Sequence, residues 1–168
     1  MKKTALIYSF NSNKTKLAAE KIAAEFEKGE VIKVNAEELA EEEFIAFDNY
    51  ILGVPTWFDG ELPNYWDEFV PALEDLNLKG KTFAIFGLGD QKGYPENFAD
   101  GIGIMTNILE NCGGKVIGST SIDGYSYESS AAVRDGKFMG LVLDQENQAR
   151  MTKERIKKWV EKLKKDFK

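Results

Sequence analysis

The sequence of 168 residues contains no histidine and only one cysteine, Cys112. Without histidine the chain cannot build a Ser-His-Asp or Cys-His catalytic centre, and it lacks the most common general base near neutral pH. Zinc or haem held by histidine is excluded for the same reason. One cysteine allows neither an internal disulfide nor a Cys-x-x-Cys motif. Redox or group-transfer chemistry on this chain would therefore have to come from a bound organic cofactor.

Long apolar runs are also missing, because no run approaches the roughly 18 residues that a membrane-spanning helix needs. The opening MKKTALIYSF starts with positive charge, but its apolar stretch is too short for a signal peptide and is better interpreted as a first strand. The expected location is the cytoplasm. Hydrophobic residues make up 43% of the chain and charged residues 30%, which is typical of a globular protein, and the length predicts a single domain over residues 1–168.

The formal net charge is −6, and it is unevenly spread. Residues 152–168 hold eight lysines or arginines against three acidic residues, so the rest of the chain is strongly acidic. An acidic body would repel nucleic acid and anionic membranes, and it would suit a basic protein partner.

Short apolar segments alternate with amphipathic segments along the whole chain. Strands are predicted over residues 4–8, 31–34, 50–54, 82–88 and 116–121, and helices over 15–28, 37–47, 65–73, 102–109 and 156–167. Nearly all-apolar strands that alternate with helices predict an α/β fold, a doubly wound three-layer αβα sandwich around a five-stranded parallel sheet. Such folds bind ligands at the carboxyl ends of the strands, so the loops after Tyr8, Val54 and Leu88 form the candidate site.

The first of these loops leads directly from a strand into a helix, where free backbone N–H groups and the positive helix end favour an anion. Its side chains add two hydroxyls, two amides and one positive charge, from Asn11, Ser12, Asn13, Lys14 and Thr15. It is not a Walker loop, because GxxxxGK[ST] is absent. The alternative interpretation is a polar turn in which Ser12 or Asn13 caps the helix.

The other two loops contain aromatic residues. Trp57 lies in the loop after Val54, and Tyr94 closes the segment 87–94, in which Gly87, Gly89 and Gly93 let the backbone approach a ligand closely. Either ring would offer a stacking surface to a planar ligand, although Trp57 folded back over the sheet edge and a merely flexible glycine loop remain alternatives. A phosphate cradle joined to two aromatic surfaces favours flavin mononucleotide (FMN) over a nucleoside triphosphate.

Three motifs carry a resemblance to long-chain flavodoxins that covers essentially the whole chain. They are Pro-Thr-Trp at 55–57, Gly-Asp-Gln-x-Gly-Tyr at 89–94 followed by Asn97-Phe98, and GKFMGLVLDQENQ at 136–148. The resemblance implies the strand order 2-1-3-4-5, with the fifth strand interrupted by an insertion at 122–143. It also implies tightly bound, non-covalent FMN and low-potential one-electron transfer between redox proteins, without catalysis on a substrate.

The resemblance assigns roles to individual residues. Trp57 and Tyr94 would flank the isoalloxazine ring, and Asp144 matches an acidic position near the ribityl end. The phosphate loop would consist of Phe10, Asn11, Ser12, Asn13, Lys14 and Thr15. The ring and ribityl chain would be lined by Thr56, Phe58, Asp59, Leu88, Gly89, Asp90 and Asn97. No metal site is expected.

The phosphate loop departs from the family pattern at two positions. Phe10 stands where a hydroxyl residue is usual, which removes a donor that Lys14 would offset, and Asn13 stands where the family has glycine. Asparagine tolerates positive φ, so the turn would survive. A second turn, at Phe58–Asp59, would reorient when the flavin is reduced and would then need positive φ at Asp59.

The resemblance implies partners such as a ferredoxin/flavodoxin–NADP reductase or a 2-oxoacid oxidoreductase, and a monomeric protein. Acidic residues near the flavin would disfavour its anionic reduced form and so lower the potential. An FMN-dependent quinone or nitro reductase on the same fold is the main alternative, but it would need a substrate pocket over the flavin and usually a dimer. A phosphorylated receiver domain would need aspartates where Ser9 and Pro55 stand. The 122–143 segment would either bind partners or cover the sheet edge.

Overall fold

The computed structural model describes residues 1–168 and contains the predicted parallel sheet. Five strands lie in the order β2-β1-β3-β4-β5, all paired in parallel, which confirms the doubly wound fold and the predicted 2-1-3-4-5 order. The strands are β1 (Thr4–Tyr8), β2 (Val31–Asn35), β3 (Asn49–Gly53), β4 (Thr82–Leu88) and β5 (Lys115–Ile117). The helices are α1 (Lys14–Ala24), α2 (Glu41–Ile45), α3 (Asn64–Glu74), α4 (Asp100–Asn111), α5 (Gln145–Gln148) and α6 (Thr152–Asp166).

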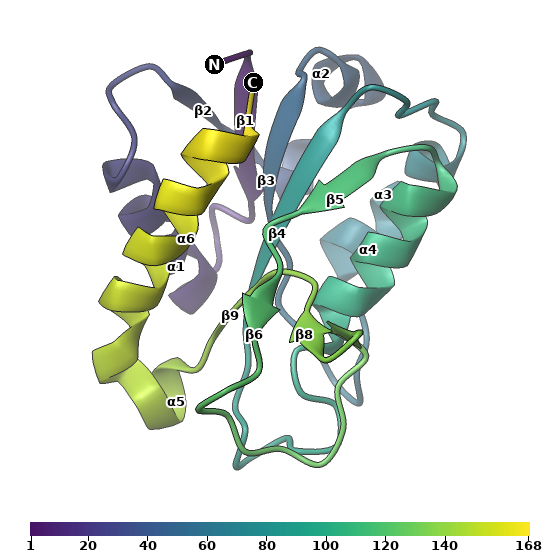
Figure 1. The fold of residues 1–168 in the computed structure, drawn as a ribbon. Coiled ribbons are helices and arrows are strands. Elements are labelled where there is room, and N and C mark those ends of the chain that lie inside the picture. Colours follow the sequence, from purple (N-terminus) through teal and green to yellow (C-terminus); the bar gives the residue numbers. More distant parts are fainter.

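The helices cover both faces of the sheet, with α1 and α6 on one side and α3 and α4 on the other (Figure 1). The two termini meet at one end of the sheet, where the Lys2 backbone N–H donates to the Lys168 carbonyl at 3.1 Å. The carboxyl ends of the strands lie at the opposite end, close to α5 (Figure 1). No helix is both long enough and apolar enough to span a bilayer.

Alternating residues of β1 explain why the strand is apolar throughout. Ala5 and Ile7 pack into the core layer that includes α3 and α4, whereas Leu6 and Tyr8 pack into the layer that includes α1 and α6. All four side chains are buried. A parallel strand covered on both faces cannot alternate apolar and polar residues, as a half-exposed strand does.

The fifth strand is interrupted as expected, but the predicted boundaries were wrong. β5 ends at Ile117 and pairs with the first half of β4, and the second half of β4 pairs with β9 (Leu141–Leu143). The predicted insertion at 122–143 thus includes residues that complete the sheet. Gly118 begins the departure with a φ of 85°, a conformation that side-chain-bearing residues avoid, and a Cβ there would lie 2.8 Å from Trp159 Nε1.

The segment between β5 and β9 forms a separate antiparallel sheet in the order β6-β8-β7, made of β6 (Thr120–Ser121), β7 (Val133–Arg134) and β8 (Lys137–Phe138). The helix predicted over 37–47 was also too long. A 3₁₀ turn, η1 (Ala36–Glu38), precedes the short α2, and a second one, η2 (Ala149–Met151), precedes α6. The Asn35 side chain accepts from the Glu37 N–H and thereby caps the start of η1. Leu39 is extended, with a ψ of 125°, and this ends η1 before α2.

Candidate functional site

Two adjoining cavities occupy the carboxyl edge of the sheet, with volumes of about 400 Å³ and 570 Å³. They share the lining residues Thr56, Trp57, Leu88, Gly89, Asp90 and Tyr94, so they form one continuous cleft. The lining comes mainly from the loops after β1, β3 and β4, where the site was predicted. The volumes are those of ordinary small-molecule sites.

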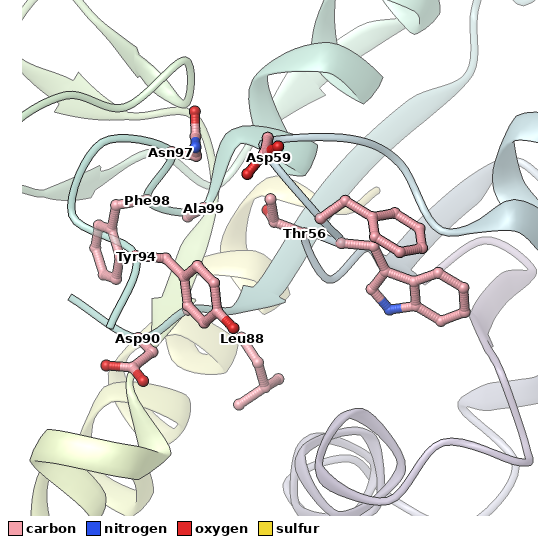
Figure 2. Close-up of a pocket in the computed structure, with 11 residues that line it drawn as sticks. Thr56, Asp59, Leu88, Asp90, Tyr94, Asn97, Phe98 and Ala99 are labelled. Atoms are coloured by element: carbon pink, nitrogen blue, oxygen red, sulfur yellow. The ribbon is translucent and has the colours of Figure 1, made fainter. Parts of the chain in front are cut away.

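The smaller cavity lies between the loops after β3 and β4. In Figure 2, Leu88 comes from the end of β4, Asp90 and Tyr94 come from the loop after it, and Thr56 and Asp59 come from the loop after β3, across from them. Three large aromatic side chains remain exposed at this cavity: Trp57 (37%), Phe58 (68%) and Tyr94 (62%). Exposed aromatic surface gathered around a hollow is typical of a binding site rather than of a covered core.

The second loop is held by a pair of backbone hydrogen bonds, since Trp57 and Glu61 exchange N–H···O contacts of 2.8 Å. The turn between them has positive φ at Phe58 (49°) and Gly60 (90°), and Asp59 is not among the residues with positive φ. The turn therefore does not have the conformation that is expected when the flavin is reduced, which needs positive φ at Asp59. The ring of Tyr65 meets Trp57 edge-on, with centroids 5.8 Å apart at 89°, and this contact fixes the plane of the indole.

The third loop is organised by Asp90. Its Oδ1 accepts from the N–H of Gly93 at 2.8 Å and of Lys92 at 3.2 Å, and from Asn147 Nδ2 at 2.7 Å. The bonds to Gly93 and Asn147 hold the pKa of this carboxyl below its usual range. A Cβ at position 93 would lie 2.5 Å from Asp90 Oδ2, so any residue other than glycine there would require the carboxylate to move. The carboxylate thus fixes the loop that ends at Tyr94.

Asp144 lies beneath the same loop and does not line either cavity. Its fully buried carboxylate accepts from Gln91 N at 3.1 Å and from Gln91 Nε2 at 2.6 Å, and it caps α5 by accepting from Asn147 N at 3.0 Å. Its place is thus under the third loop rather than at the surface of the cleft. Phe10 does not line the cleft either, because its ring packs on Tyr8 with centroids 5.0 Å apart.

The other predicted residues do line the cleft. They are Asn11, Ser12, Asn13, Lys14, Thr15, Thr56, Trp57, Phe58, Asp59, Leu88, Gly89, Asp90, Tyr94 and Asn97. Their individual contacts with a ligand stay predictions.

The larger cavity contains the start of α1, and no side chain caps that helix. Asn13 at the N-cap position has a φ of −86°, so the expectation of positive φ at this position was wrong. The chain turns earlier in the loop, and Asn13 already has the helical conformation. Lys14 forms an ion pair with Glu146. The uncapped N–H groups of the first turn are therefore free to bind an anion.

Several lining residues were missed from the sequence: Ser9, Glu37, Pro55, Tyr65, Phe98, Ala99 and Glu146. Glu37 had a usable signal, since it follows β2 and the carboxyl end of β2 lies beside that of β1. The predicted site included only the ends of β1, β3 and β4. Tyr65 was interpreted solely as part of a helical face.

The chemistry of the cleft is divided between its ends. One end offers backbone N–H groups, the hydroxyl of Thr15 and the ammonium of Lys14, which together suit a phosphate. The Ser12 hydroxyl lines the same end but donates to the Ser9 carbonyl at 2.7 Å. The other end offers the exposed rings of Trp57 and Tyr94, which suit a flat aromatic group. A ligand that joins a phosphate to a planar ring fits this arrangement, and FMN is such a molecule.

Comparisons with known proteins agree with this geometry. A family model described as Flavodoxin matches residues 6–159. The flavodoxin of Trichodesmium erythraeum is 44% identical over 169 residues, covering 99% of both chains. The flavodoxin of Helicobacter pylori is 41% identical over 168 residues, again covering 99% of both.

A solved structure shows the same fold throughout. The Fusobacterium nucleatum flavodoxin bound to flavin mononucleotide has a TM-score of 0.95 and 36% identity, with 100% of each chain covered. A single-residue mutant of that flavodoxin, also bound to flavin mononucleotide, matches with the same TM-score of 0.95.

Proposed function

The chain belongs to the flavodoxin family, and on that premise we propose that its cleft holds one non-covalently bound FMN. The protein is an FMN-based electron carrier that passes single electrons between redox proteins at low potential. One observation carries the proposal: a single cleft has an uncapped helix N-terminus at one end and exposed aromatic rings at the other. Bound FMN supplies the one-electron redox chemistry that the side chains lack.

The residues at the start of α1 would hold the phosphate. The first-turn N–H groups and the positive end of the helix dipole stabilise negative charge, and the Thr15 hydroxyl adds a neutral donor. The Ser12 hydroxyl would add a second one by exchanging the Ser9 carbonyl for the phosphate. Lys14 contributes a positive charge once it exchanges Glu146 for the phosphate. Asn11 faces the same cavity, although its side-chain amide already donates to Glu37.

Trp57 and Tyr94 would enclose the ring system and exclude water from it. Tyr65 holds the indole plane of Trp57, and Asp90 with Gly93 holds the loop that carries Tyr94. Thr56, Phe58, Asp59, Leu88, Gly89 and Asn97 would complete the lining. Asp144 supports the third loop from beneath through Gln91 and so acts on the site indirectly.

We further propose that the protein has no substrate of its own and acts as a monomer in the cytoplasm. Bulky rings at the cleft leave little room for a substrate over the flavin, which disfavours the quinone or nitro reductase alternative. The exposed acidic residues Asp59, Glu61 and Glu96 surround the cleft and suit basic docking surfaces. A ferredoxin/flavodoxin–NADP reductase and a 2-oxoacid oxidoreductase are the partner classes we expect.

The test is direct. The purified protein should show flavin absorbance, and acid release followed by mass spectrometry should give FMN in a 1:1 ratio with the chain. FAD as the released ligand, or no binding after reconstitution of the apoprotein with FMN, would overturn the proposal. Oxidation of NAD(P)H by the isolated protein at the rate of an enzyme would instead support the reductase alternative.

A further inference from the structure

The carboxylate of Glu37 holds the first turn of the loop after β1. Its Oε1 accepts from Ser9 Oγ at 2.6 Å, and its Oε2 accepts from Asn11 Nδ2 at 2.7 Å. Both contacts join segments more than 20 residues apart in the sequence. Ser9 is only 1% exposed, so without Glu37 its hydroxyl would lose its acceptor in a buried position.

Asn35, at the end of β2, adds a second attachment between the same two segments. Its Oδ1 accepts from Phe10 N and from Glu37 N, each at 3.2 Å. Within the loop, Asn11 N donates to Ser9 Oγ, and Ser12 N donates to the Ser9 carbonyl, each at 3.3 Å. The backbone N–H groups of residues 10, 11 and 12 are therefore all used inside the protein.

These bonds determine which groups can meet an anion. With residues 10–12 committed, the donors left in the loop are the N–H groups at the start of α1, from Asn13 onward, which have no intrahelical acceptor. No side chain caps them. The position of this helix start depends on the turn before it, and that turn is tied to β2 through Ser9, Asn11 and Glu37.

Glu37 also brings an electrostatic penalty, because it lines the same cavity as the phosphate-binding groups. Hydrogen bonds from Ser9 and Asn11 hold the pKa of its carboxyl below the usual range, so it is ionised at neutral pH. A carboxylate beside a phosphate repels it. If charge alone mattered, removing Glu37 would therefore strengthen phosphate binding, whereas loss of its two hydrogen bonds would weaken it.

We propose that Glu37 is a positioning residue for the cofactor phosphate: it holds Ser9 and Asn11 so that the loop presents the free amides of α1 to the ligand. This inference rests on the proposed function, because it takes FMN as the ligand. Glu37 acts through the loop and does not itself contact the phosphate.

The experiment compares FMN with riboflavin, which lacks the phosphate, in fluorescence titrations of the apoprotein. In Glu37→Ala we expect FMN affinity to fall by about tenfold, because the loss of a hydrogen bond to a charged group changes a binding constant by about that factor. Riboflavin affinity should stay within about twofold. Glu37→Gln keeps one acceptor and should give an intermediate loss. Glu38→Ala is the matched control, because it removes the same charge from an exposed neighbour without a hydrogen bond.

Tighter FMN binding by Glu37→Ala would overturn the inference, since Glu37 would then act only as a repelling charge. Equal losses for FMN and riboflavin would also overturn it, because the damage would be general. If Glu37→Ala does not fold, Asn11→Ala removes one of the two contacts and should weaken FMN but not riboflavin; no change would count against the inference. Failure of the wild-type protein to bind FMN would instead contradict the proposed function.

Discussion

At the residue scale, two tyrosine hydroxyls have opposite surroundings. Tyr50 donates to the carbonyls of Phe44 and Phe47 at 2.6 Å and 3.0 Å, whereas the Tyr65 hydroxyl is buried without a hydrogen-bond partner. Burial raises the pKa of both, and in Tyr65 the Glu37 carboxylate raises it further. A buried hydroxyl without a partner costs stability, and a bonded one contributes to it.

Replacing each tyrosine by phenylalanine should therefore change stability in opposite directions. We expect Tyr65→Phe to raise the free energy of unfolding of the apoprotein by about 1 kcal/mol, and Tyr50→Phe to lower it by a similar amount. Urea denaturation of the two variants and the wild type measures both effects. A decrease in both variants would mean that Tyr65 has an acceptor in solution.

The aromatic residues at the cleft give a second prediction. We expect Trp57→Ala and Tyr94→Ala each to weaken FMN binding by about 3- to 10-fold, because stacking contributes roughly 0.5–1.5 kcal/mol beyond the buried area. Trp57→Phe and Tyr94→Phe retain a ring and should lose less. Ile32→Ala, at an exposed apolar side chain outside both cavities, serves as the control for general effects in the same fluorescence titration. Unchanged affinity in both alanine variants would show that these rings do not flank the flavin.

At the element scale, the sequence predicts elements whose environment is uniform along their length. β4 has the predicted bounds 82–88, because a central strand buried on both faces is apolar from end to end. The fifth strand was harder. Residues 116–121 read as one β segment, but the sheet uses only 115–117 and then resumes at 141–143. The break arises because β5 pairs with only the first half of β4 and β9 pairs with the second half. The local sequence of 116–121 does not show where this pairing ends.

In the candidate site too, the local sequence predicted some features, and others depended on contacts between distant segments. The three loops were predictable, since strand ends in a doubly wound sheet meet at one edge. Glu37 and Tyr65 were missed because they reach the cleft through the adjacency of β2 to β1 and the packing of α3 under Trp57. The error at Asn13 has a similar origin, as the turn of the loop is set by bonds to Asn35 and Glu37 rather than by residue 13 itself.

The junction between β9 and α5 gives an element-scale prediction. Asp144→Asn replaces a carboxylate oxygen that accepts from Gln91 N and Nε2, and an amide group would set a donor against donors. We expect a loss of roughly 2–3 kcal/mol in the free energy of unfolding and faster amide exchange at Gln91. Asp123→Asn, at an exposed position, is the control. Normal exchange at Gln91 in Asp144→Asn would mean that the Asp144 carboxylate does not support the third loop.

At the scale of the whole molecule, the charges are separated. The exposed acidic residues Asp59, Glu61 and Glu96 lie in the loops around the cleft. The basic residues of 152–168 lie on α6, which runs along one face of the sheet from α5 to the terminus at the far end (Figure 1). Such a separation orients the molecule in the field of a basic partner, so that the cleft approaches first.

The rate of electron transfer should therefore depend on salt in a way that identifies the acidic rim. With a basic cytochrome c as the electron acceptor, we expect the second-order rate of the reduced protein to fall by about tenfold between roughly 10 mM and 200 mM salt, because the screening length shortens from about 30 Å to below 10 Å. Glu61→Gln combined with Glu96→Gln should lower the low-salt rate and flatten this dependence. Lys165→Gln changes one charge at an exposed position in the last turn of α6 and should leave the slope nearly unchanged. Stopped-flow measurement of the electron-transfer rate at several ionic strengths gives the slope for each variant and for the wild type. If Lys165→Gln steepens the slope by about half as much as the Glu61/Glu96 double variant flattens it, net charge alone governs the encounter, and the acidic rim does not orient it.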